Sequence, residues 1–225
     1  SEMCIRDSTH LSLIGFMGSG KSTLGKKLAE RLDRPFVDTD VEVEKMLGMT
    51  VREVFDTLGE SAFREAEQDA LSDALRPSDP IVLATGGGTP CAEGAMEWMR
   101  RRSLVVALQP PMDVLLERLK QRQEHRPLIH DKHGKELQRT VERMMLTRAA
   151  CYGSAHVVWR QSLETAEAID LGENFSAGSR DYLQVLAAAQ LVPLLDKEKF
   201  SLSPAGEFEV NEKKTIGVNV SNKME

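Results

Sequence analysis

The residues best suited to chemistry lie near the N-terminus, where Gly15–Ser22 read Gly-Phe-Met-Gly-Ser-Gly-Lys-Ser. Glycines at this spacing let the backbone turn tightly, so that successive N–H groups point inward at phosphate oxygens. Lys21 adds a mobile positive charge for the β- and γ-phosphates of a nucleotide, and the Ser22 hydroxyl is placed to ligate Mg²⁺. The pattern therefore predicts a phosphate-binding loop.

The segments on either side of this loop support that interpretation. Leu11–Ile14 is an apolar run typical of a short strand, and leucines recur at positions 24, 28 and 32, which is the spacing of one helix face. The N-terminus of that helix would direct its partial positive charge at the same phosphates. The alternative, a glycine-rich turn with a chance lysine, explains neither flanking segment.

Two carboxylates follow in Phe36–Asp40, which reads Phe-Val-Asp-Thr-Asp. Asp38 and Asp40 are expected at the end of a strand, and their i, i+2 spacing predicts that both leave the same strand face. Parallel sheets bind ligands at the carboxyl ends of their strands, so both carboxylates are expected at the nucleotide site. One would serve the Mg²⁺ shell and the other a substrate hydroxyl. A solvated acidic turn is the alternative.

Arg64 and a glycine triplet come next along the chain. Arg64 has Glu60 four residues before it and Glu67 three residues after it, so a surface ion-pair cluster on a helix is the favoured interpretation from the residues alone. Gly86–Gly88 end an apolar run. Three consecutive glycines cost stability and make sense where the backbone must approach a ligand closely. A plain strand-to-helix turn is the alternative.

Two more arginines are of interest. Arg126 begins a stretch rich in basic residues between two helical segments, as a mobile lid would, and an arginine there could close over a transferring phosphoryl group. The histidines around it match no usual metal-ligand spacing, which favours a solvated loop. Arg148, in the stretch Thr-Arg-Ala-Ala-Cys-Tyr, is uninformative by itself.

Alternating strands and helices must position these residues. Five apolar runs are predicted as strands, at 11–16, 36–40, 81–85, 104–108 and 156–159, and most are nearly continuous, as in a parallel sheet covered on both faces. Between them, Thr50–Glu53 is a capping box, Gly59 ends the helix that follows it, and Pro110-Pro111 opens another helix. The pattern predicts a three-layer α/β domain over about residues 9–160.

The composition narrows the classes of function. The 225 residues are 41% hydrophobic and 28% charged, which is enough for one sizeable core, and the formal net charge is -6. That charge argues against binding of nucleic acid or of an anionic membrane, and no apolar run approaches the ~20 residues of a membrane span. A reducing, cytoplasmic compartment is the default expectation.

The cysteines are Cys4, Cys91 and Cys151, an odd and scattered set. They form no C-x-x-C pair, so the sequence predicts neither a disulfide framework nor a zinc site. Cys91 and Cys151 are expected to be small residues in the core or near the surface.

The two ends of the chain are expected to differ from the domain. Met3–Ser8 resembles the translation of a sequencing-library adapter, so residues 1–8 are expected to be non-native. The domain is expected to span residues 9–195, with one more helix over Tyr182–Leu195. Residues 196–225 are polar and weakly patterned, and are expected to form a loosely ordered tail.

Taken together, the motifs resemble those of the shikimate kinase family. The resemblance runs from the phosphate-binding loop to Trp159 and rests on the loop, Phe-Val-Asp-Thr-Asp, Gly-Glu-x-x-Phe-Arg-x-x-Glu, Gly-Gly-Gly, Arg-Pro-Leu and Arg-x-x-x-Tyr, in that order. It implies the three-layer fold of a P-loop kinase, with a five-stranded parallel sheet in the order 2-3-1-4-5. It also implies transfer of the ATP γ-phosphoryl group to the 3-hydroxyl of shikimate, a step of aromatic amino-acid biosynthesis by way of chorismate.

The resemblance also implies a role for each matching residue. Asp40 would hold the substrate hydroxyls and orient or deprotonate the nucleophile. Arg64 and Arg148 would bind the shikimate carboxylate, and Arg126 would be the lid arginine at the ATP phosphates. Asp38 would help hold Mg²⁺ through water, together with Ser22. The implied ATP-binding residues are Gly18, Ser19, Gly20, Lys21, Ser22, Thr23 and Arg126. The implied shikimate-binding residues are Asp40, Arg64, Gly86, Gly87, Gly88 and Arg148, and the implied catalytic residues are Lys21, Asp40 and Arg126.

Some points depart from the family pattern or stay open. Ala150-Cys151 stands where the family usually has Pro-Leu before the tyrosine. Either Arg118 or Arg122 could be the arginine that contacts the nucleotide ahead of the lid. The protein is expected to be a monomer with small-molecule partners. A non-catalytic nucleotide-binding relative and a related small-molecule kinase such as gluconate kinase are the alternatives, and the gluconate kinase family lacks this combination of acid, arginine and glycine motifs.

Overall fold

A computed structural model of the chain describes residues 10–121, 128–160, 168–171, 200–202 and 208–210. The expectations for residues 1–8, for the lid residue Arg126 and for the helix over 182–195 concern residues outside these ranges. Within the described residues, no helix is both long and apolar enough to cross a membrane.

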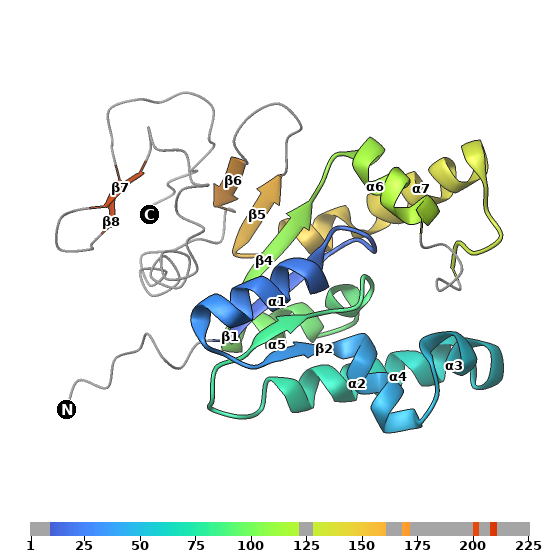
Figure 1. Ribbon diagram of the computed structural model, residues 1–225, viewed down its shortest axis with the longest axis horizontal. Helices are drawn as coiled ribbons and strands as arrows, with labels where there is room; N and C mark the ends of the chain where they lie inside the picture. Colours follow the sequence, from blue (N-terminus) through green and yellow to red (C-terminus); the bar gives the residue numbers. More distant parts are fainter. Residues whose placement is uncertain (1–9, 122–127, 161–167, 172–199, 203–207, 211–225) are drawn as a thin grey trace.

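The main sheet has six strands in the order β2-β3-β1-β4-β5-β6 (Figure 1). The parallel strands are β1 (His10–Gly15), β2 (Phe36–Asp38), β3 (Val82–Ala84), β4 (Ser103–Gln109) and β5 (Val157–Arg160). Strand β6 (Ala168–Leu171) pairs antiparallel with β5 at the edge. The predicted five-stranded parallel sheet and its order are confirmed, and β6 is an addition that the sequence did not indicate.

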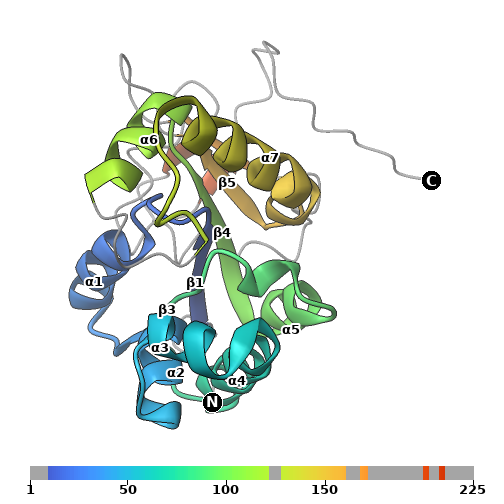
Figure 2. The ribbon, with the colours of Figure 1, turned by 90° about the vertical axis from the view of Figure 1, so that its right-hand side faces the viewer.

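Helices cover both faces of this sheet. Figure 2 shows α1 on one side of the sheet and α5 and α7 on the other. The helices are α1 (Lys21–Leu32), α2 (Thr39–Leu47), α3 (Val51–Thr57), α4 (Gly59–Ala74), α5 (Ala95–Arg102), α6 (Met112–Gln121) and α7 (Gly134–Gly153), with a 3₁₀ helix η2 (Thr89–Cys91). The predicted three-layer α/β architecture is therefore confirmed.

The strand side chains alternate between the two faces, and both faces are buried. In β4, Leu104 and Val106 belong to a core cluster that includes Leu28 of α1. Val105, between them, belongs to the opposite cluster, which includes Met99 of α5. All five side chains are almost fully buried. Burial on both faces is why the strands are continuous apolar runs instead of alternating ones.

Helices α2, α3 and α4 form a small group with a core of its own, which includes Val43, Val54 and Phe63. The predicted capping box is present, because Thr50 accepts from the Glu53 N–H and Glu53 accepts from the Thr50 N–H. Helix α3 ends at Thr57, and Gly59, at φ 84°, begins α4. This group carries two of the residues predicted for the site, Asp40 on α2 and Arg64 on α4.

The strand predicted over 36–40 is wrong at its end. Strand β2 stops at Asp38, and Thr39 begins α2. The cause is local: the Asp38 carboxylate accepts from the Asp40 N–H at 3.1 Å and caps the helix. Asp40 therefore lies in the first helical turn, and the argument that Asp38 and Asp40 share a strand face does not hold.

Two short strands lie in the segment predicted as a tail. Strand β7 (Phe200–Leu202) pairs antiparallel with β8 (Phe208–Val210) in a separate two-stranded sheet. The other residues of 196–225 lie outside the described ranges, so the loosely ordered tail and the domain boundary at residue 195 stay predictions.

Candidate active site

A cavity of about 500 Å³ opens above the phosphate-binding loop. The strand–loop–helix context that the motif requires is present, because β1 ends at Gly15 and α1 begins at Lys21. Gly18 (φ 80°) and Gly20 (φ 99°) take the positive φ angles that the tight loop needs. The cavity is lined by Met17, Gly18, Ser19, Gly20, Lys21, Ser22, Thr23, Leu24, Lys27, Asp38, Asp40, Thr85, Gly87, Arg118 and Gln121.

Lys21 lies over the loop that precedes it. Its ammonium donates to the carbonyl oxygens of Gly15 at 2.9 Å and Phe16 at 3.0 Å. The side chain is buried, with 8% of its surface exposed. The first turn of α1 directs backbone N–H groups at the same cavity, because the first N–H groups of a helix have no partner within it. The loop is thus a site of positive potential suited to phosphate.

Ser22 and Asp38 meet at the edge of this cavity. The Ser22 hydroxyl donates to Asp38 Oδ2 at 2.6 Å. A hydroxyl and a carboxylate supply hard oxygen ligands, which Mg²⁺ prefers, and Mg²⁺ usually keeps several waters beside one or two protein ligands. The described residues contain no cluster of three or more His, Cys, Asp or Glu for a metal ion. The donor set therefore fits Mg²⁺ shared with nucleotide phosphates, rather than a metal held by the protein alone.

Arg118 and Ser19 also lie at the phosphate-binding loop. Arg118, on α6, donates from Nη1 toward the carbonyl oxygens of Gly18 and Ser19 at 3.4 and 3.5 Å, so it lies at the loop. Arg122 lies outside the described residues. Ser19 lines the cavity, but its N–H donates to the Phe16 carbonyl at 3.1 Å, so that N–H is engaged within the loop.

A second cavity, of about 100 Å³, adjoins the first. Met17, Asp40 and Gly87 line both cavities, so they stand at the junction between them. Both carboxylates of the acid pair do reach the nucleotide cavity, as predicted, although Asp40 reaches it from α2. The second cavity is lined by Met17, Asp40, Val51, Phe55, Phe63, Arg64, Glu67, Gly86, Gly87, Gly88, Leu128 and Arg148.

Arg64 is held by two carboxylates of its own helix. It donates from Nη1 to Glu67 at 2.8 Å and from Nη2 to Glu60 at 2.9 Å. Burial lowers the pKa of Arg64, but the hydrogen bonds and charges of Glu67 and Glu60 outweigh burial and raise the pKa above its usual value. Glu67 is 1% exposed, so the favoured interpretation of a surface cluster is wrong for this pair.

The glycine triplet is required by its neighbours. A Cβ at Gly86 would overlap the Glu67 carboxylate and lie 2.8 Å from Asp40 Oδ1. A Cβ at Gly88 would lie 2.7 Å from Arg64 Nη1. The triplet therefore leaves room for side chains of the protein itself, and the predicted close approach of this backbone to a ligand stays a prediction. Gly86 is fixed further by its N–H, which donates to Thr39 Oγ1 at 2.8 Å.

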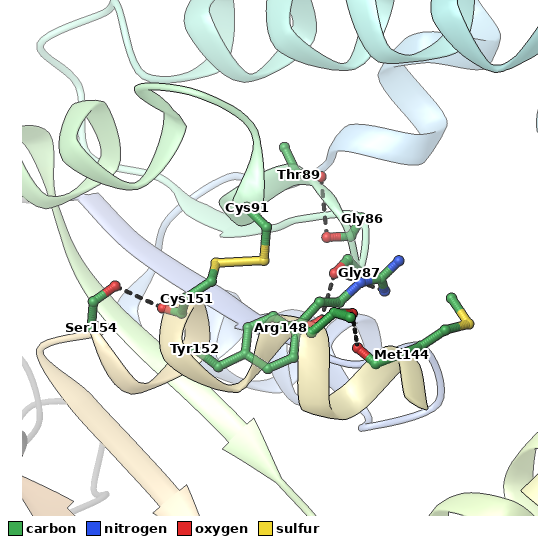
Figure 3. Close-up of a disulfide and its surroundings, with 10 residues drawn as sticks. Gly86, Gly87, Thr89, Cys91, Met144, Arg148, Cys151, Tyr152 and Ser154 are labelled. Carbon is green, nitrogen blue, oxygen red and sulfur yellow. Dashed lines mark hydrogen bonds between the residues drawn. A yellow bond between two sulfur atoms is a disulfide. The ribbon is translucent and has the colours of Figure 1, made fainter. Parts of the chain in front are cut away.

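Arg148 reaches the triplet from α7 (Figure 3). Its Nη1 donates to the Gly87 carbonyl at 3.2 Å, and its guanidinium lies 5.4 Å from the centre of the Phe16 ring. The Tyr152 hydroxyl donates to the same carbonyl at 2.5 Å. Burial raises the pKa of Tyr152, so this hydroxyl keeps its proton as a donor. Two side chains one helical turn apart therefore hold α7 against Gly87.

Cys91 and Cys151 are joined by a disulfide (Figure 3). The expectation of two unconnected small residues is wrong, and so is the inference that the cysteines include no disulfide. Cys91 ends η2, directly after the glycine triplet, and Cys151 precedes Tyr152 on α7. They are 60 residues apart in the chain, and short-range spacing carries no signal for such a pair.

Sequence reasoning missed the residues that support the site. Thr89 donates to Glu67 Oε1 at 2.6 Å and to the Gly86 carbonyl at 3.1 Å, which ties the triplet to the Arg64 partner. Nothing in the sequence around Tyr152 indicates its hydrogen bond to the Gly87 carbonyl. The sequence shows Glu67 three residues after Arg64. It does not show that Glu67 is buried, because that burial depends on the packing of α4 against η2.

Comparison with known proteins gives a consistent result. The sequence model of the shikimate kinase family matches residues 17–171. A shikimate kinase of Azobacteroides pseudotrichonymphae is 38% identical over 147 residues, which is 65% of this chain and 86% of that protein. A shikimate kinase of Bartonella henselae is 36% identical over 163 residues, covering 72% of this chain and 75% of its own length.

Solved structures agree with the sequence matches. The shikimate kinase of Bacteroides thetaiotaomicron superposes with a TM-score of 0.65 at 32% identity, covering 82% of this chain and 96% of that one. The shikimate kinase of Acinetobacter baumannii, whose structure holds shikimate, gives a TM-score of 0.64 at 29% identity, covering 82% and 94%.

Proposed function

The chain belongs to the shikimate kinase family, and we propose from this premise that it transfers the γ-phosphoryl group of ATP to the 3-hydroxyl of shikimate. The observation that carries the proposal is the junction of the two cavities. A phosphate-binding cavity and a smaller cavity containing two arginines share Asp40 and Gly87. A donor phosphoryl group and an acceptor hydroxyl would meet at that junction.

The loop and α1 would bind and orient ATP. The Lys21 ammonium would leave the carbonyls of Gly15 and Phe16 and move onto the β- and γ-phosphates, where it would stabilise charge in the transition state. Ser22 and Asp38 would hold Mg²⁺, Asp38 through water. When bound, Mg²⁺ would neutralise the negative charge that develops on the phosphates. The position of Arg118 supports a contact with the nucleotide by that residue.

The second cavity would bind shikimate. Arg64 and Arg148 face it from two different helices, and guanidinium groups bind carboxylates with charge-assisted hydrogen bonds. Glu67 and Glu60 offset the charge of Arg64, so the two guanidinium groups would recognise the carboxylate mainly through directed hydrogen bonds. The glycine backbone at 86–88 would approach the ring without side-chain bulk.

Asp40 is the residue that we assign to the acceptor hydroxyl. It lines both cavities, so its carboxylate could accept the proton of the hydroxyl while the phosphorus lies on the side of the loop. Phosphoryl transfer asks the protein mainly for positioning and charge stabilisation, and both halves of the site supply them. Arg126 would complete the site as a lid residue on the ATP phosphates.

A coupled ADP-release assay with ATP, Mg²⁺ and shikimate tests the proposal. We expect turnover that saturates with shikimate and that is lost when Mg²⁺ is chelated. Folded protein without shikimate-dependent ADP release would contradict the proposal and favour the non-catalytic alternative. Gluconate in place of shikimate is the control for the other kinase class, and no turnover is expected with it.

A further inference from the structure

The Cys91–Cys151 disulfide includes an exposed cysteine and joins two elements of the acceptor half of the site. Cys91 is exposed and Cys151 is half-buried. Their Cα atoms are 5.6 Å apart, within the range that a disulfide spans. A thiolate reagent attacks the more accessible sulfur of a disulfide, and because Cys91 is the more exposed residue we assign the attack to its Sγ.

The disulfide joins the two elements that form the shikimate cavity. Cys91 is two residues beyond Thr89, which donates to the Gly86 carbonyl, and three residues beyond Gly88. Cys151 lies between Arg148 and Tyr152 on α7, and both of these donate to the Gly87 carbonyl (Figure 3). The disulfide therefore joins α7 to the segment that follows the glycine triplet, beside the two hydrogen bonds that join α7 to Gly87.

We propose that Cys91 and Cys151 form a reversible thiol–disulfide site that sets the affinity of the acceptor cavity, the oxidised form binding shikimate more tightly. The proposal rests on the proposed function for the identity of the acceptor. A protein surface that is ordered before binding loses less conformational freedom on binding, and this raises affinity. The disulfide orders the glycine triplet against α7, whereas the phosphate-binding loop has no covalent tie to either cysteine among the described residues.

The chemistry balances with a small-molecule dithiol or disulfide as the co-reactant. On reduction, a thiolate of the dithiol attacks Cys91 Sγ, the bond to Cys151 Sγ breaks, and Cys151 leaves as a thiolate. The second thiol of the reagent then displaces Cys91, and the reagent becomes a cyclic disulfide. Two electrons pass to the protein, and the two cysteine thiolates take up protons at neutral pH. Glutathione disulfide drives the reverse reaction and yields two molecules of glutathione.

The first experiment tests the site without any substrate. The full chain is equilibrated in glutathione buffers of varied redox ratio, alkylated, and weighed by mass spectrometry. We expect three alkylated thiols at the reducing end and one, from Cys4, at the oxidising end, with a reversible transition between them. Three free thiols in every buffer would overturn the proposal. Hydrogen exchange of the amides at 86–91 and 148–153 should be slower in the oxidised form, and equal exchange would also overturn it.

The second experiment tests the coupling to the acceptor cavity. Reduction is expected to raise the KM for shikimate by about fivefold, at the lower end of allosteric coupling, with the KM for ATP unchanged. By reciprocity, saturating shikimate should shift the glutathione equilibrium toward the disulfide by the ratio of the shikimate Kd values of the two forms, measured by calorimetry. An unchanged shikimate KM between verified redox states would overturn the proposal. Absence of turnover in both states would count against the proposed function instead, and the thiol counts and hydrogen exchange would still decide the redox site.

Matched variants separate the disulfide from general thiol effects. Cys91→Ser should show the KM of the reduced form in every buffer, and Cys4→Ser should respond to redox state as the unaltered chain does. A response that persists in Cys91→Ser would overturn the assignment to this pair. The comparison of oxidised and reduced unaltered protein needs no variant, so the test holds even if a substitution impairs folding.

Discussion

Gly88→Ala tests whether the glycine triplet exists to leave room for Arg64. The added Cβ would lie 2.7 Å from Arg64 Nη1, which is about 0.7 Å inside ordinary contact at 3.4 Å. Gly88 has a φ of -99°, which alanine adopts freely, so backbone strain does not enter. The substitution therefore acts through the guanidinium alone.

The magnitude follows from what holds that guanidinium. Nη1 donates to the buried Glu67 at 2.8 Å and thereby holds the guanidinium where it would bind the shikimate carboxylate, so a displacement of about 0.7 Å should cost Arg64 a hydrogen bond to the substrate. A hydrogen bond to a charged group contributes about 1.5–3 kcal/mol, which is about a 10- to 150-fold rise in the KM for shikimate. The KM for ATP should stay within about twofold, because Gly88 is not among the residues that line the nucleotide cavity.

Steady-state kinetics with each substrate varied in turn measures the effect. Gly153→Ala is the matched control, because a Cβ at that position, also on the acceptor side, meets nothing within 4 Å, and the variant should behave as the unaltered chain does. A Gly88→Ala enzyme with an unchanged shikimate KM would refute the argument that Arg64 occupies that space. Equal loss of affinity for both substrates would show disruption of the whole site instead.

Three further changes have distinct expected outcomes. Lys21→Ala should lower turnover at least 10³-fold, by about 4 kcal/mol or more, because it removes the loop cation that would stabilise charge on the γ-phosphate. Lys26→Ala, at an exposed position of the same helix, is the control, and both are measured by ADP release. Asp40→Asn should lower kcat about 10²- to 10⁴-fold while Mg-ATP binding, measured by calorimetry, persists, and a change confined to KM would contradict its role as proton acceptor. Burial and the charge of Arg100 lower the pKa of His156 from 6.5 to about 4. Stability from the neutral ring is therefore complete above pH 6.5 and is lost as the pH falls toward 4; urea unfolding should show about 2 kcal/mol less stability at pH 5 than at pH 7.5, and His156→Asn should reduce that difference.

Local patterns in the sequence predicted the donor half of the site well. The phosphate-binding loop is a contiguous motif whose function depends on backbone conformation, and Gly18 and Gly20 take the expected positive φ angles. Asp38 and Asp40 reach the expected cavity, but not because they share a strand face. The Asp38 carboxylate caps α2, and Asp40 lies in the first turn of that helix. An Asp side chain can cap a helix or continue a strand, and a short polar sequence does not show which of the two structures forms.

The acceptor half of the site was harder to predict from the sequence, because it depends on packing between residues that are distant in the chain. The link from Glu67 to Thr89 and the contact of Tyr152 with Gly87 join residues that are 22 and 65 positions apart. Nothing in the spacing of such residues marks them as partners. The disulfide is the same case, since three scattered cysteines allow several pairings and also none. The family resemblance pointed to Arg64 and Arg148, which both line the second cavity. It could not reveal the disulfide, because Cys151 departs from the family pattern.

The two halves of the site are assembled from very different stretches of chain. The loop, Ser22 and Asp38 all fall within residues 15–38, whereas the acceptor cavity needs α2, α4, the glycine triplet and α7 together. A brief local opening of α7 would thus remove the acceptor cavity and leave the nucleotide loop folded. Bound shikimate would in turn hold α7 closed, so the acceptor acts as a stabiliser of the C-terminal side of the domain. Protease resistance of that side would then report on the supply of substrate, independently of catalysis.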